Sequence, residues 1–328
     1  MTFKTTISTI LTLAVILFSA RSISQNEGIS NYKKYFAFTQ TGTQKFLIIR
    51  QYQKAGKQFY IGVDFSDLST RIFASDDIKT VPANWEKIQT DYKDTPYIQA
   101  INFTRQQSLN LQDSGISNGY PEEKGITLTI DLCPSGKPLD RIIFTSLINE
   151  FGKIEKPVPL ALSITGKFML SHPDDMQWLK NREASNDIRI TWINHTYNHF
   201  YNPKLPLAEN FLLKPGTDIN FEILETEKAL LERGLLFSVF FRFPGLVSDQ
   251  SLIEKVTGYG LIPIGSDAWL AKGQTAHDGN IVLIHGNGNE PLGVKDFLKL
   301  LQDEKSAVTN KEWLLYDLRE SVEDEFEK

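Results

Sequence analysis

The stretch RITWINHTYNHF, residues 189–200, decides how the rest of the sequence is interpreted. From Ile188 to Ile193 it is largely apolar and β-branched, a pattern typical of a buried strand. Just beyond that strand, His195 and His199 stand four residues apart. On one helical turn this spacing brings two side chains about 5–6 Å apart, so both imidazoles can bind one cation. Ordinary loop or packing histidines share this spacing, so the prediction of a metal pair depends on the neighbouring motifs.

The amino-acid composition is that of a globular protein and does not favour nucleic-acid binding. The 328 residues are 41% hydrophobic and 23% charged, which is enough apolar material for a globular core. Lys and Arg number 35 against 40 Asp and Glu, giving a net charge of −5 without a basic run, so we expect no nucleic-acid partner. Cys133 is the single cysteine, so the fold must depend on its core rather than on an intrachain disulfide.

The first 24 residues have the features of a signal peptide. Lys4 precedes an apolar run from Ile10 to Phe18, and Ser22 and Ser24 are small residues in front of a plausible cleavage point. The run is shorter than the roughly 20 apolar residues of a membrane span. We therefore expect a secreted or periplasmic protein with no membrane span after cleavage.

Residues 25–123 predict a small α+β accessory domain. Strands are expected at 35–38, 45–52, 59–63, 71–74 and 97–103, a short helix at 85–92, and a linker at 112–123. Gly56 lies in the turn of a predicted hairpin. The region contains no catalytic constellation, so it either packs on and positions the main domain or uses exposed aromatic residues to bind a glycan or a partner.

Residues 124–310 alternate between strand and helix patterns. Strands are expected at 126–131, 158–165, 188–193, 235–241, 261–264 and 281–284, and helices at 138–151, 173–183, 217–233, 249–257 and around 294–301. Such alternation builds a parallel sheet covered by helices, either open or closed into a barrel. Residues 311–328 are expected to form a solvated acidic tail.

Reactive side chains fall at the ends of these predicted strands. They are Asp131, His195, His199, Arg242, Asp267, Trp269 and His285. Because the carboxyl ends of parallel strands meet at one face, we expect these groups to converge there.

Five motifs in order carry a resemblance: LTIDLCPS (128–135), NHTYNH (194–199), FRFPG (241–245), SDAW (266–269) and IVLIH (281–285). Together they are similar to the polysaccharide deacetylase (NodB-homology) family of metal-dependent carbohydrate esterases, over about residues 125–305. The resemblance implies an irregular (β/α) barrel of α/β class. It also implies removal of an acetyl group from a glycan nitrogen or oxygen.

The resemblance assigns roles to this chain's residues. His195 and His199 would hold a divalent ion, with Zn²⁺ the first choice. Asp131 would act as the base, Arg242 would keep it oriented and ionised, and His285 would be the acid. On the substrate side, Leu283 would line the acetyl pocket and the Gly245 N–H would stabilise the oxyanion. Asp267 is expected to tune His285, and Trp269 is either a substrate platform or a core residue.

One ligand expected from the resemblance is missing. The family places a second aspartate after the base, where this sequence has Leu132. Asp140 is the first candidate for the third ligand, and Asp131 itself is the alternative. Cys133 could bind zinc as a thiolate, but a small side chain in tight backbone space is the favoured explanation for it.

Two functions remain open from the sequence. The first is an exported metal-dependent hydrolase that deacetylates a cell-wall or extracellular polysaccharide. The second is an inactive relative that uses the same cleft to bind glycan or a protein partner. The lost carboxylate at Leu132 favours the second, whereas the retained acid, base and histidine pair favour the first.

Overall fold

The computed structural model describes residues 28–107, 111–119 and 124–326. The expected signal peptide, residues 1–24, lies outside this range. Within it, no helix combines the length and the apolar character needed to cross a membrane.

The N-terminal region is an antiparallel sheet with two helices, as predicted for an α+β unit. Its strands are β1 (Ser30–Thr41), β2 (Gln44–Lys54), β3 (Lys57–Asp64), β4 (Thr70–Ala74) and β5 (Val81–Pro82), in the order β4-β3-β2-β1-β5. Gly56 has a φ of 75° in the tight turn between β2 and β3, which explains a glycine there. Helix α1 (Trp85–Asp91) begins at Asn84, whose side chain accepts from the N–H groups of Glu86 and Lys87.

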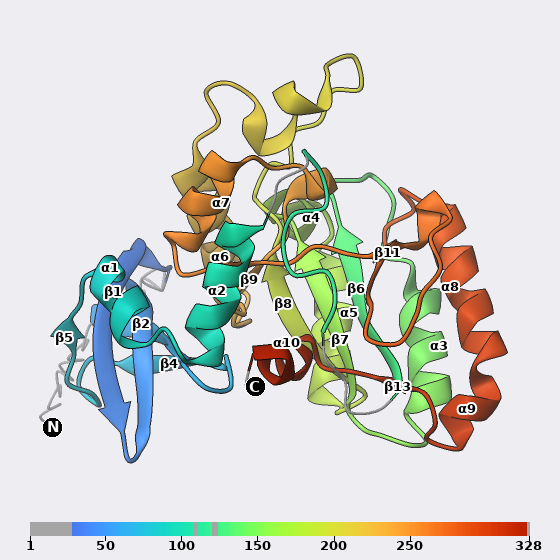
Figure 1. Ribbon diagram of the computed structural model, residues 1–328, viewed down its shortest axis with the longest axis horizontal. Coiled ribbons are helices and arrows are strands. Elements are labelled where there is room, and N and C mark those ends of the chain that lie inside the picture. The colour runs from blue at the N-terminus through green and yellow to red at the C-terminus, as the bar shows by residue number, and fades with distance from the viewer. Residues whose placement is uncertain (1–27, 108–110, 120–123, 327–328) are drawn as a thin grey trace, which may run out of the picture.

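The strand expected at 97–103 is wrong, because this segment belongs to helix α2 (Pro96–Gln106). Pro96 occupies the first turn, where a missing N–H has no effect on the helix. The buried positions Tyr97, Ile101 and Thr104 follow the 3.6-residue period of a helix rather than the two-residue period of a strand. Helix α2 lies between the antiparallel sheet and the larger parallel sheet (Figure 1).

The main sheet is parallel and curled. Its strands are β6 (Gly125–Leu132), β7 (Val158–Ile164), β8 (Ile188–Asn194), β9 (Phe240–Phe241), β10 (Ile262–Pro263), β11 (Ala268–Trp269), β12 (Ile281–His285) and β13 (Leu314–Leu315). The order is β10-β9-β8-β7-β6-β12-β11, and β13 pairs with β6. This curled half-barrel is consistent with the predicted irregular (β/α) barrel.

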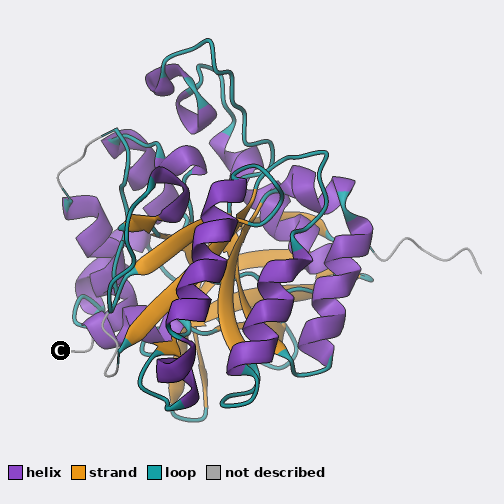
Figure 2. Ribbon diagram, turned by 90° about the vertical axis from the view of Figure 1, so that its right-hand side faces the viewer, coloured by secondary structure: helices purple, strands orange, loops and turns teal. Residues whose placement is uncertain are grey.

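Helices cover the outer face of the curled sheet (Figure 2). The helices of this part of the chain are α3 (Arg141–Phe151), α4 (Gly166–Ser171), α5 (Pro173–Ala184), α6 (Ile219–Glu232), α7 (Gln250–Thr257), α8 (Pro291–Asp303), α9 (Lys305–Thr309) and α10 (Leu318–Phe326). Four short 3₁₀ turns, η1 (Leu207–Glu209), η2 (Phe211–Leu213), η3 (Pro244–Leu246) and η4 (Leu270–Lys272), lie in the connecting segments. Every residue of β6 and β7 is buried, as expected for strands covered on both faces.

The expected strand at 235–241 is shorter than its apolar run suggested. Only Phe240 and Phe241 pair in the sheet as β9. Before them, the N–H and hydroxyl groups of Ser238 both donate to the Trp192 carbonyl. Apolar composition marked the run as buried, but burial alone does not require ladder pairing.

The described part of the expected linker, 111–119, completes the sheet. Ile116 bridges to Ile264 just after β10, and Asn118 bridges to Asn280 just before β12. The segment therefore lies across the interval between two strands that do not pair directly with each other.

The expected solvated tail is wrong for residues 314–326. Leu318 and Val322 of α10 are buried, and the Phe326 ring lies 5.5 Å from that of Phe103 in α2. The acidic residues occupy the outer face of an amphipathic helix, so composition alone misled the prediction.

A buried ion pair joins the two sheets. Arg50 of β2 and Glu227 of α6 are both fully buried, with two guanidinium–carboxylate hydrogen bonds of 2.7 and 2.8 Å. Tyr32 of β1 donates to the same carboxylate, and Arg50 also donates to the Tyr259 carbonyl. The large core cluster likewise contains residues of both sheets, so the accessory sheet is packed firmly against the main one.

We expect Arg50→Met to lower the free energy of unfolding by roughly 3–5 kcal/mol, because Glu227 would remain buried without its counter-charge. Urea unfolding monitored by circular dichroism measures the change. Lys299→Met, which removes one partner of an exposed pair with Asp303, is the control and should change stability by less than about 0.5 kcal/mol. Equal effects of the two substitutions would contradict the role given to Arg50.

Candidate active site

The predicted reactive residues converge at the carboxyl ends of the parallel strands. Asp131 lies near the end of β6 and pairs in register with His285 at the end of β12. His195 directly follows β8 and Arg242 directly follows β9. All four residues are buried. Parallel topology therefore collects, from distant parts of the chain, a carboxylate, a guanidinium and two imidazoles at one end of the sheet.

Cys133, His195 and His199 form a compact set of metal-ligand atoms, all within 4.8 Å of one another. The Cys133 Sγ lies 3.6 Å from His195 Nε2 and 3.4 Å from His199 Nε2. In a tetrahedral zinc site, with Zn–S near 2.3 Å and Zn–N near 2.0–2.1 Å, sulfur and nitrogen ligands stand about 3.6 Å apart. The chemistry and spacing of this donor set therefore fit a zinc ion.

Hydrogen bonding orients the His195 ring. Its Nδ1 lies 2.9 Å from the backbone carbonyl of Arg242. A carbonyl only accepts, so Nδ1 carries a hydrogen and Nε2 is the ring nitrogen on the Cys133 side, where a metal ion would bind.

Asp131 lies between His195 and Arg242. Its Oδ2 is 3.6 Å from His195 Nε2, and its Oδ1 is 3.6 Å from an Arg242 terminal nitrogen. The other terminal nitrogen of Arg242 donates to the Gly265 carbonyl at 2.9 Å. These distances to Asp131 are too long for hydrogen bonds, and its buried Oδ1 accepts none from the described residues. That oxygen therefore remains free to accept from a reacting molecule.

The environment of Cys133 favours its thiolate. Burial raises the pKa of the thiol, but the nearby imidazoles of His199, His195 and His285 outweigh burial and hold the pKa well below its ordinary value. The backbone of Cys133 is also held in place, because its carbonyl accepts from the side-chain amide of buried Asn287.

The turn that carries the two histidines is strained and strongly held. Thr196 and His199 have positive φ angles of 69° and 48°, which side-chain-bearing residues adopt at a cost. Glu222 of α6, itself buried, accepts hydrogen bonds of 2.8 Å from the N–H groups of Tyr197 and Asn198 and from the Asn198 side chain. Three bonds to one carboxylate therefore hold the turn in place.

His285 is paired with an acidic residue from the next loop. Its Nδ1 lies 2.8 Å from Glu290 Oε2, and the same oxygen accepts from the Trp269 indole N–H at 2.7 Å. Burial lowers the pKa of His285, but the Cys133 sulfur and the Glu290 carboxylate more than offset this, so the pKa lies well above its ordinary value. These contacts favour the protonated form of His285.

Two expected assignments change. Asp140 lies outside the cluster that could hold a metal ion: its Oδ2 accepts from the Gly288 N–H, and Cys133 supplies the third donor atom of the cluster. Asp267 does not contact His285; its Oδ2 accepts from Asn280, and burial raises its pKa to about 6. The structure places Glu290 beside His285, in the role expected of Asp267.

The residues expected on the substrate side form two groups. Leu283 and Trp269 pack with Leu246 in a small buried apolar cluster, and the Trp269 and His285 rings lie 5.9 Å apart. Gly245, with a φ of 62°, lies apart from this cluster and packs against Phe211. A Cβ added at Gly245 would come within 2.7 Å of the Phe211 ring. Trp269 is thus both a core residue and a donor to Glu290.

Four contributors were missed or undervalued from the sequence. Cys133 as a ligand had a usable signal, because it is two residues after Asp131 and side chains at that spacing share a face of a strand. Glu290, Glu222 and Asn287 had no such signal, since glutamates and asparagines in a helix or loop are usually solvated.

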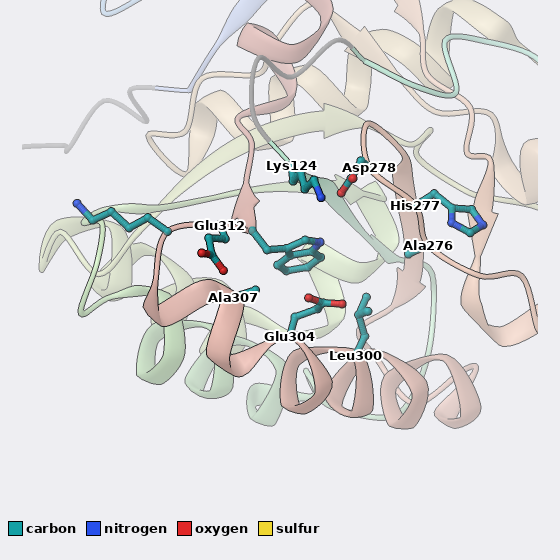
Figure 3. Close-up of a pocket in the computed structure, with 10 residues that line it drawn as sticks. Lys124, Ala276, His277, Asp278, Leu300, Glu304, Ala307 and Glu312 are labelled. Atoms are coloured by element: carbon teal, nitrogen blue, oxygen red, sulfur yellow. The ribbon is translucent and has the colours of Figure 1, made fainter.

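A separate hollow of about 730 Å³ lies away from this site (Figure 3). Lys124 lines it just before β6, and His277 and Asp278 line it just before β12. It therefore opens at the amino ends of the strands, opposite the convergent residues.

No protein-family model matches the sequence. Similar solved structures include a family 4 carbohydrate esterase from Bacillus anthracis, 18% identical with a TM-score of 0.47, covering 70% of this chain and 92% of that chain. Another is PdaA of Bacillus subtilis, 17% identical with a TM-score of 0.45, covering 66% and 94% respectively. The structural neighbours are family 4 carbohydrate esterases. They include a pseudoenzyme from Bacillus anthracis, 14% identical with a TM-score of 0.42, covering 69% of this chain and 82% of that chain.

We expect the ligand set to be visible with cobalt in place of zinc. A thiolate–cobalt bond gives a ligand-to-metal charge-transfer band, and Cys133→Ser should abolish it because the softer sulfur donor is lost. Asp140→Asn is the control and should retain the band. A band that survives Cys133→Ser would show that Cys133 is not a ligand.

Proposed function

We propose that this protein is a metal-dependent hydrolase that removes acetyl groups from a glycan, by N- or O-deacetylation. The observation that carries the proposal is the ligand set of Cys133, His195 and His199 within 4.8 Å, with Asp131 beside it and His285 near the Cys133 sulfur. This combines a cation site with one group suited to accept a proton and one suited to donate it.

The ligand set would hold a divalent ion, with Zn²⁺ favoured by the sulfur donor. Bound there, zinc would supply Lewis-acid polarisation of the acetyl carbonyl and a lowered pKa for water. Cys133 takes the ligand role that the family gives to the aspartate missing at Leu132. Its thiolate-favouring environment supports that role, because the thiolate is the form that binds metal.

Asp131 is the proposed base. Its buried Oδ1 has no hydrogen-bond donor among the described residues and so can accept a proton from an attacking water. Arg242 faces the same oxygen at 3.6 Å and places a positive charge beside the carboxylate. The position of Asp131 between the guanidinium and His195 supports this division of roles.

His285 is the proposed acid, with Glu290 as its positioning residue. The Glu290 carboxylate holds Nδ1, which leaves Nε2 as the nitrogen that can donate a proton to the leaving amine or alkoxide. Leu283 and Trp269 would line the space for the acetyl group beside His285, and the Gly245 N–H would contact the oxyanion.

The proposed substrate is an acetylated cell-wall or extracellular polysaccharide. Export supports this class, and export itself rests on the leader pattern in residues 1–24. We place the mature protein outside the cytoplasm, in the periplasm or secreted.

Acetate release tests the function. Purified protein should contain one metal equivalent and release acetate from acetylated chitooligosaccharides or acetylxylan, and both should be lost with chelator. His195→Ala should lower kcat at least about 10²-fold, because the substitution removes a ligand. His277→Ala, a histidine replacement at the opposite end of the sheet, should leave kcat unchanged. Absence of metal and of acetate release from both substrates would instead favour a binding protein that uses the same cleft.

Glu290→Gln should move the alkaline limb of the kcat–pH profile to lower pH. Glu290 contributes to the raised pKa of His285, so its neutralisation lowers that pKa. Activity requires protonated His285 and is lost as pH rises through this pKa, so the loss must begin at lower pH in the variant. An unmoved alkaline limb would contradict the acid role of His285 or its coupling to Glu290.

A further inference from the structure

A cavity of about 330 Å³ adjoins the catalytic site through His199. It lies between the turn that carries the histidines, the amino end of α4, the segment 211–218 and the start of α6. His199 and Pro244 line this cavity and also belong to the NHTYNH and FRFPG motifs. A ligand in the cavity would therefore contact His199, one of the proposed metal ligands.

Two lysines reach this cavity without a carboxylate partner in the described chain. Lys167, in the first turn of α4, is held beside the histidine turn because its N–H donates to the Tyr197 carbonyl. Lys214 carries its ammonium group 4.1 Å from the centre of the Phe200 ring. Both side chains are exposed, and neither belongs to an ion pair found among the described residues.

The two carboxylates that line the cavity, Glu222 and Asp218, already accept hydrogen bonds from nearby N–H groups. Glu222 uses both oxygens, one for the Tyr197 and Asn198 N–H groups and the other for the Asn198 side chain. Asp218 caps α6 by accepting from the Phe221 N–H. The formal charges of the lining cancel, but these hydrogen bonds engage three of the four carboxylate oxygens, whereas neither ammonium group has a carboxylate partner among the described residues.

Aromatic rings give the cavity a second kind of surface. Phe200, Phe211 and Phe221 line it, and Phe221 is 40% exposed. Beside them, the exposed Tyr201 ring stacks on Phe211 with centroids 5.2 Å apart. Flat apolar rings beside donors are suited to the faces and hydroxyl groups of sugars.

We propose that this cavity is a subsite for an anionic sugar unit, carrying a carboxylate or a phosphate, next to the acetylated unit of the substrate. The inference rests on the proposed function, because it takes the reacting acetyl group to lie on the Cys133 side of His199. Lys167 and Lys214 bind the anion, and the phenylalanines pack against the sugar ring. The preferred substrate is accordingly an acidic acetylated glycan rather than a neutral one.

Equilibrium binding tests the subsite without requiring turnover. The carboxylate probe is an O-acetylated oligogalacturonide, compared with the same oligosaccharide as its methyl ester. The phosphate probe is di-N-acetylchitobiose that carries a 6-phosphate on one of its two units, compared with unmodified di-N-acetylchitobiose. Wild-type protein should bind the acidic member of one pair about tenfold more tightly, measured by isothermal titration calorimetry. The pair that shows the preference identifies the anion.

The double variant Lys167→Gln/Lys214→Gln should lose this preference, because both ammonium groups are removed. Lys204→Gln is the matched control and should keep the preference, because Lys204 is an exposed lysine between β8 and α6 that does not line the cavity. Absence of any acidic preference in wild-type protein, or its survival in the double variant, would overturn the subsite.

Acetate release, measured in parallel, separates this inference from the proposed function. Acidic preference in binding without acetate release would leave the subsite standing and remove the deacetylase function. Equal binding of acidic and neutral members with acetate release from both would keep the function and remove the subsite.

Discussion

The turn that carries His195 and His199 is the constraint on which the site depends. Thr196 and His199 adopt left-handed backbone angles that side-chain-bearing residues avoid, so the turn needs external support. Glu222 provides it through three hydrogen bonds, and the Thr196 and Tyr197 carbonyls accept from the N–H groups of Gly166 and Lys167. A turn held at so many points keeps both imidazoles near the same sulfur with little freedom to separate.

Helix α6 links that turn to the accessory sheet. Glu222 near its start holds the histidine turn, and Glu227, five residues on, forms the buried pair with Arg50 of β2. A buried charge that lost its partner would be strongly unfavourable, so the helix and the sheet must stay together. The N-terminal region is therefore packed against the helix that holds the histidine turn.

Cys133 lies next to Leu132, the position at which the resemblance predicts a second aspartate. Leu132 is fully buried, and as the neighbour of Asp131 it points to the opposite face of the strand. Cys133, one residue further, returns to the face that Asp131 shares and brings a sulfur within 3.4–3.6 Å of both histidines. The cluster of Cys133, His195 and His199 thereby offers three donor atoms that could hold a metal ion, and the sulfur is a softer donor than a carboxylate oxygen.

The sequence by itself determined the class of fold and the main reactive residues. Apolar periodicity predicted β6, β7, β8 and β12 nearly to the residue, and the rule that parallel strands present their carboxyl ends at one face placed Asp131, His195, Arg242 and His285 together. Only the tertiary structure decided the partners of those residues. Glu290, Glu222 and Arg50 act through contacts between segments far apart in the chain, and periodicity carries no information about such contacts. The same limit explains the errors at α2 and α10, where burial against another element, rather than local composition, determined the structure.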